Sequence, residues 1–67
     1  MNLLNLLNHF KKLDWIELLI PEEINVETYH VGFDFGYVDF SDRFVNDWYL
    51  EKDALGDLIL HIDLCVR

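Results

Sequence analysis

Apolar and polar side chains alternate near the end of the chain, which reads Leu58-Ile59-Leu60-His61-Ile62-Asp63-Leu64. The three leucines and Ile62 share one parity, and a period of two residues places side chains on one face of a β-strand. Gly56 and Asp57, which precede the run, are typical of a turn. The sequence therefore predicts a C-terminal strand whose leucine face lies in the core.

A second alternation lies upstream, where aromatic residues and Val31 occupy every second position from Tyr29 to Tyr37. This period predicts another strand, with glycine and polar side chains on its opposite face. Val38 and Phe40 continue the alternation on the shifted parity, so we expect a bulge at Gly36. The strand is expected to end near Ser41.

The N-terminal residues have the spacing of an amphipathic helix. Its apolar stripe consists of Leu3, Leu6, Leu7, Phe10 and Leu13, and Asn2 is suited to cap it. The stripe breaks at Asp14, where Asp14-Trp15-Ile16-Glu17 has the spacing of a capping box. We expect either a second helical turn over residues 15–20, closed before Pro21, or a kinked continuation of the first helix.

Residues 42–55 allow two interpretations. As a strand, they place Phe44, Trp48 and Leu50 on one face of an antiparallel meander; as a helix, they are capped by Ser41 and closed by Gly56. The pair Trp48-Tyr49 favours the strand. In both cases the fold class is α+β: an N-terminal amphipathic helix, broken near Asp14, packed on a small, mainly antiparallel sheet of three or four strands. Residues 1–67 form a single small domain.

Composition limits the classes of function. The chain has 67 residues, 13 acidic and 5 basic side chains, and a formal net charge of -8 at pH 7. Because this charge opposes phosphate backbones and anionic lipid, we expect no direct binding to nucleic acid or to membranes. Hydrophobic residues make up 52% of the chain, which predicts a folded domain rather than a disordered acidic tail.

Targeting and cross-linking signals are missing from the sequence. The single cysteine, Cys65, permits no intramolecular disulfide, and the first residues lack the cationic region of a secretory leader. No run of 18 or more apolar residues occurs, as a membrane-spanning helix would need. We therefore expect a soluble, cytoplasmic protein.

A few polar side chains permit metal or nucleophile chemistry. His30 and Asp34 share one strand face, and His61, Asp63 and Cys65 share another, so a common side of the sheet would bring them together. A metal site or a cysteine nucleophile is the minor hypothesis, because the polar face of any strand carries such residues. No catalytic or phosphate-binding motif occurs, and we expect no enzyme activity and no cofactor.

Acidic and aromatic side chains gather in the second half of the chain, between residues 34 and 57. Tyrosine and tryptophan anchor protein interfaces, and carboxylates attract basic partners. The predicted partner-binding residues are Tyr37, Asp39, Asp42, Asp47, Trp48, Tyr49, Glu51 and Asp53. We expect a small non-catalytic interaction protein, of the inhibitor, immunity or anti-defence type, that occupies a basic surface of a nucleic-acid-handling partner and mimics nucleic acid.

The alternative hypothesis is a structural role. A homodimer, or an accessory subunit of a larger assembly, would bury the apolar residues that fall off the helical stripe, namely Leu4, Trp15, Leu18 and Leu19.

Overall fold

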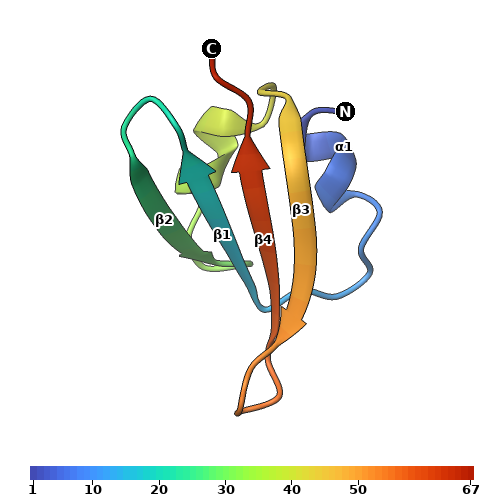
Figure 1. The fold of residues 1–67 in the computed structure, drawn as a ribbon. Helices are drawn as coiled ribbons and strands as arrows, with labels where there is room; N and C mark the ends of the chain where they lie inside the picture. Colours follow the sequence, from blue (N-terminus) through green and yellow to red (C-terminus); the bar gives the residue numbers. More distant parts are fainter.

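A four-stranded sheet, one α-helix and one 3-10 helix make up the computed structural model, which describes residues 1–67 (Figure 1). In chain order the elements are α1 (Leu3–Leu7), β1 (Trp15–Ile20), β2 (Asn25–His30), η1 (Gly36–Phe40), β3 (Val45–Lys52) and β4 (Leu58–Leu64).

The strands lie in the order β2-β1-β4-β3, so β1 and β4 are central and β2 and β3 are edges. β1 is antiparallel to β2, and β3 is antiparallel to β4, whereas β1 and β4 run parallel. A parallel pair needs a long crossover, and here the chain passes through β2, η1 and β3 before it reaches β4. The expected sheet, mainly antiparallel, is therefore a mixed sheet of four strands, and the α+β class holds with little helix.

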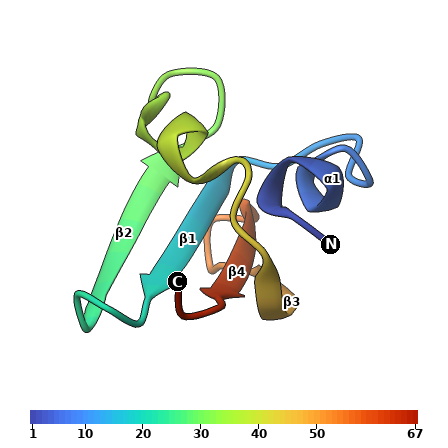
Figure 2. The same cartoon turned by 90° about the horizontal axis from the view of Figure 1, so that it is seen from above.

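One face of the sheet carries the core. The fully buried side chains alternate along the two central strands and are joined by two leucines of α1; they are Leu3, Leu6, Ile16, Leu18, Ile20, Leu60, Ile62 and Leu64. The predicted C-terminal strand and its buried face are confirmed. In the view from above, α1 and the yellow-green η1 lie on one side of the sheet and no element lies on the other (Figure 2).

The N-terminal helix is much shorter than the stripe predicted. Asn2 caps it as expected, because its Oδ1 accepts a hydrogen bond from the N–H of Asn5 at 2.8 Å, but α1 ends at Leu7. Phe10 and Leu13 pack against the core from the loop that follows. Helical spacing therefore marked core residues correctly, although only the first of them are helical.

The second helical turn predicted over residues 15–20 is wrong, as is the kinked helix, because these residues form β1. Ile16, Leu18 and Ile20 are buried, and the residues between them point to the other face. Residues 14–20 thus carry both the spacing of a capping box and a period of two. Pairing with strands on both sides satisfies the backbone of β1 and outweighs the local helical signal.

The strand predicted over Tyr29–Tyr37 is wrong beyond its first two residues. β2 ends at His30, whose N–H donates to Asp34 Oδ2 at 3.0 Å, and the chain turns through Gly32 at a φ of 95°. Residues 36–40 form η1 instead of a bulged strand. Tyr29 and Tyr37 both pack against the core, so the apolar spacing continued through a turn.

The strand interpretation of residues 42–55 is confirmed by β3, but the antiparallel meander is wrong, because β3 pairs with β4 and not with β2. A β-bulge between Val45 and Asp47 shifts the parity of the strand, so Phe44 precedes it and stands apart from Trp48 and Leu50. The β3–β4 turn is closed by Asp53, whose Oδ1 accepts hydrogen bonds from the N–H groups of Leu55 and Asp57, both at 2.9 Å.

Replacing Leu18 by alanine tests the orientation of β1. We expect the free energy of unfolding to fall by about 2–5 kcal/mol, because the fully buried side chain would leave a cavity. The matched control is Leu19→Ala, at the adjacent residue, which is 40% exposed and should lose less than about 1 kcal/mol. Urea unfolding of the two variants measures both values, and equal losses would contradict this orientation.

Candidate functional site

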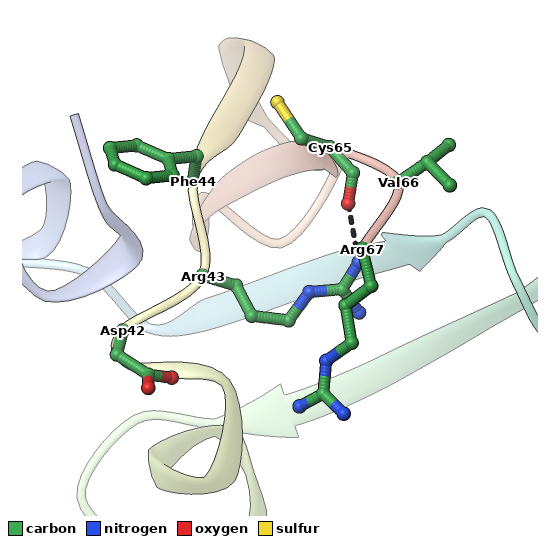
Figure 3. Close-up of a pocket in the computed structure, with 6 residues that line it drawn as sticks. All are labelled: Asp42, Arg43, Phe44, Cys65, Val66 and Arg67. Atoms are coloured by element: carbon green, nitrogen blue, oxygen red, sulfur yellow. Dashed lines mark hydrogen bonds between the residues drawn. The ribbon is translucent and has the colours of Figure 1, made fainter.

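A hollow of about 440 Å³ opens where the chain enters β3 and leaves β4 (Figure 3). Its lining residues are Asp42, Arg43, Phe44, Cys65, Val66 and Arg67. Arg43 is 8% exposed and uses its Nη2 to donate to Glu22 Oε1 at 2.5 Å and to the carbonyl oxygen of Cys65. The Cys65 thiol points away from the guanidinium group (Figure 3).

The Arg43 guanidinium therefore binds three segments of the chain together and is not an unpaired group for a ligand. It links the turn after β1, the start of β3 and the end of β4. The hydrogen bond from Arg43 is the main cause that lowers the pKa of Glu22 to about 2, and the backbone N–H groups of Glu22 and Arg67 contribute. We assign this hollow a structural role.

The face of the sheet that neither α1 nor η1 covers is a surface of a different kind, which we call the open face. Since Ile16, Leu18 and Ile20 point into the core, alternation directs the other residues of β1 to the uncovered side. The strand registers then give three rows across β2, β1, β4 and β3: His30, Trp15, Ile59 and Glu51; Thr28, Glu17, His61 and Tyr49; Val26, Leu19, Asp63 and Asp47.

Negative charge on the open face is not balanced by any cation side chain. Its charged members are Glu17, Asp47, Glu51 and Asp63, and none of its residues is lysine or arginine. Asp47 and Asp63 are direct partners on neighbouring strands, where like charges repel. Two uncharged donors contact this pair: the amide of Asn46 donates to Asp63 Oδ2 at 3.0 Å, and the N–H of Trp48 donates to Asp47 Oδ1 at 2.8 Å.

His61 lies at the centre of the open face between two carboxylates. Its Nδ1 is 3.4 Å from Glu17 Oε1 on β1, and its Nε2 is 3.3 Å from Glu51 Oε1 on β3. Its ring stacks on Tyr49 with 4.3 Å between the ring centroids. The imidazole thereby connects three strands.

The side chains around His61 do not form a metal site. Glu17 and Glu51 approach opposite nitrogens of the His61 ring, so the three groups do not converge on one point. His30 lies two strands away on β2, and Cys65 follows the end of β4. No group of three or more histidine, cysteine or carboxylate side chains is placed to hold a metal ion.

Apolar side chains are interspersed with the carboxylates of the open face. Leu19, Val26 and Tyr49 are 40%, 48% and 58% exposed. A shallow hollow of about 150 Å³ lies between them, and a second one of about 290 Å³ lies beside Trp15 and Thr28. Both are smaller than the ~300–1,000 Å³ of small-molecule pockets. The shape suits a protein surface better than a small ligand.

The eight residues predicted to bind a partner do not form one surface. Asp47, Tyr49 and Glu51 lie together on the open face. Trp48 lies on the other face of β3, where its ring meets Phe10 edge-on at 5.4 Å. The remaining predicted residues are elsewhere: Tyr37 and Asp39 in η1, Asp42 in the turn after it, and Asp53 in the β3–β4 turn.

Sequence reasoning missed the half of the open face that comes from β1 and β4. The helical interpretation places Glu17 and Leu19 in a helical turn, and the polar spacing of β4 indicates Asp63 only as a metal ligand. Recognising the alternation of residues 15–20 would have placed them beside Asp47 and Glu51. Leu18, predicted to form a dimer contact, is instead fully buried in the core.

No protein-family model, curated protein or solved structure matches the chain. None of its helices has the length and apolar character needed to span a membrane. Its function is therefore inferred from the geometry of the open face.

The Glu22–Arg43 pair predicts a pH dependence of stability. The pKa of Glu22 is about 2 in the folded chain, against 4.5 for a free carboxyl, so deprotonated Glu22 favours folding. This contribution is complete above about pH 4.5 and is lost as the pH falls toward about 2. We expect Glu22→Gln to flatten this part of the stability profile in urea unfolding. Glu23→Gln, at a neighbour that forms no ion pair, should leave the profile unchanged; equal effects would contradict the assignment.

Proposed function

We propose that the chain is a small, non-catalytic interaction protein that covers a basic surface of a nucleic-acid-handling partner with the open face of its sheet. The single observation that carries the proposal is the presence of four carboxylates, and of no lysine or arginine, on an uncovered face. Small acidic proteins of the inhibitor, immunity or anti-defence type act by occupying a basic surface of their partner in this way.

The spacing of these carboxylates supports nucleic-acid mimicry. Neighbouring strands lie about 4.8 Å apart, and alternate residues of one strand are about 6.8 Å apart. These separations are of the same order as those between phosphates along a nucleic-acid strand, so cations that receive phosphates can also receive Asp47, Asp63 and Glu51. Opposite charge would give fast association that weakens with salt.

Exposed apolar side chains of the open face contribute binding affinity that charge alone does not supply. Tyr49 presents a ring held by stacking on His61, and Leu19 and Val26 lie beside each other on β1 and β2. Rigid aromatic and aliphatic groups supply most of the affinity of protein interfaces, whereas surrounding charges set rate and specificity. The open face combines both kinds of group.

A second copy of the chain is a poorer occupant of the open face. Two such faces in contact would bring together eight carboxylates, because each carries four, and burying unpaired like charges is costly. A homodimer or an accessory subunit would have to use other exposed residues, such as Leu4, which is 51% exposed. The charge of the open face thus favours a basic partner.

Charge reversal tests the proposal. A partner recovered by affinity purification at low salt from the native host should be basic, and nucleic acid should compete for it. We expect the double variant Asp47→Lys with Asp63→Lys to weaken binding by about tenfold or more, because favourable contacts become repulsive. Titration calorimetry at two salt concentrations measures the affinities.

The matched control is the double variant Asp39→Lys with Asp42→Lys, which changes the net charge equally but away from the open face. Its affinity should change by less than about threefold at moderate salt. Equal losses in the two double variants, or no basic partner at low salt, would refute the proposed function.

A further inference from the structure

We infer that the partner contributes an extended segment that adds to the free edge of β3 as a new strand, with its basic side chains beside Asp47 and Glu51. This inference rests on the proposed function and names how the partner docks. It follows from the phase of the hydrogen bonds along β3, from the unpaired backbone groups on that edge and from the side chains that flank them.

The β3–β4 hairpin determines which backbone groups face outward. Asp53 N–H donates to the carbonyl oxygen of Asp57 at 3.0 Å, and the register continues from there to Asp47 without a shift. In an antiparallel pair, bonded and non-bonded residues alternate, so Tyr49 and Glu51 bond to β4. The backbone groups of Trp48, Leu50 and Lys52 therefore point away from the sheet.

Two of these outward N–H groups have no partner. The N–H of Trp48 is covered by Asp47 Oδ1 at 2.8 Å, whereas no turn or loop backbone bonds to Leu50 or Lys52. The carbonyl groups of Trp48 and Leu50 face the same way. Together they present donors and acceptors at the ~6.8 Å repeat that an incoming strand requires.

The chain itself already extends this edge at the other end of β3. Val45 N–H donates to the carbonyl oxygen of Met1 at 2.9 Å, and Asn2 forms an antiparallel bridge with Phe44. The N-terminal residues accordingly lie beside the upper end of β3 (Figure 1). The lower part of the same edge, from Trp48 to Lys52, is left without a strand.

Side chains on the two faces of β3 specify the chemistry of the added segment. Asp47 and Glu51 lie on the open face, while Trp48 and Leu50, which are 43% and 45% exposed, lie on the other. Cross-strand neighbours of opposite charge, and pairs of apolar residues, stabilise a sheet. A segment in which lysine or arginine alternates with apolar residues satisfies both faces at once.

The other edge of the sheet lacks these features and provides an internal comparison. By the same alternation, Val26 and Thr28 of β2 direct their backbone groups outward, because Val31 N–H donates to the carbonyl oxygen of Asp14 at 3.0 Å. Their side chains lie on the open face but are uncharged. A basic strand would gain backbone bonds at β2 but no carboxylate beside them on the open face.

Proline substitution distinguishes strand addition at β3 from strand addition at β2. Proline removes an N–H donor and is tolerated on an edge strand where that N–H faces outward. The probe is a short synthetic peptide in which lysine and valine alternate. We expect Leu50→Pro to weaken its binding by about tenfold or more, while Thr28→Pro, the matched change on β2, alters it by less than about twofold.

Hydrogen exchange on the unaltered protein gives a measurement that does not depend on the folding of the variants. Saturating peptide should slow exchange at the N–H groups of Leu50 and Lys52 by at least about tenfold and leave those of Val26 and Thr28 unchanged. Protection at β2 instead of β3, or failure of the peptide to bind, would overturn the inference.

The outcomes distinguish this inference from the proposed function. If the Asp47→Lys, Asp63→Lys variant loses the basic partner while Leu50→Pro keeps it, strand addition is wrong and the acidic surface still acts. If both open-face reversal and the proline change leave partner binding intact, both proposals fail.

Discussion

The parallel contact between β1 and β4 is the pairing on which the rest of the structure depends. It joins two strands that are distant in sequence and aligns Ile16 and Leu18 with Leu60 and Ile62 in one buried layer. The antiparallel partners β2 and β3 then extend this pair outward as its edges. Because so few residues of the chain are helical, there is enough covering material for one face only. The open face is a direct consequence of that limit.

Electrostatics act differently on the two sides of the molecule. Arg43 is nearly buried, and its charge is met by Glu22 and by a backbone carbonyl, so it stabilises the chain's own architecture. On the open face, Glu17 and Glu51 have only the imidazole of His61 between them, and no lysine or arginine of that face neutralises the four carboxylates. The net charge of -8 is therefore less informative than its distribution, which leaves the arginines at one end of the sheet and none on its open face.

Much of the fold could be predicted where one local pattern acted alone. The alternation of β4 identified that strand because one of its faces lies against the core, and the aromatic pair of β3 identified the other because such residues favour strands. Prediction failed at β1, where a capping-box spacing competed with alternation, and beyond β2, where apolar spacing persisted through the turn at Gly32. The parallel register of β1 and β4 depends on contacts between distant residues, which no local pattern encodes. For that reason the sequence located Asp47, Tyr49 and Glu51 but not Glu17 or Asp63 beside them.

The aspartates that cover edge N–H groups also bear on how copies of the chain behave when crowded. Asp34 occupies the donor of His30 on β2, and Asp47 occupies that of Trp48 on β3. If identical chains paired edge to edge into a larger sheet, each such junction would lack one backbone hydrogen bond, because the N–H is already bonded to an aspartate. The carboxylate would also lie next to the junction. These aspartates therefore oppose edge-to-edge aggregation of the chain. The edge of β3 from Leu50 to Lys52 nevertheless stays accessible to another strand.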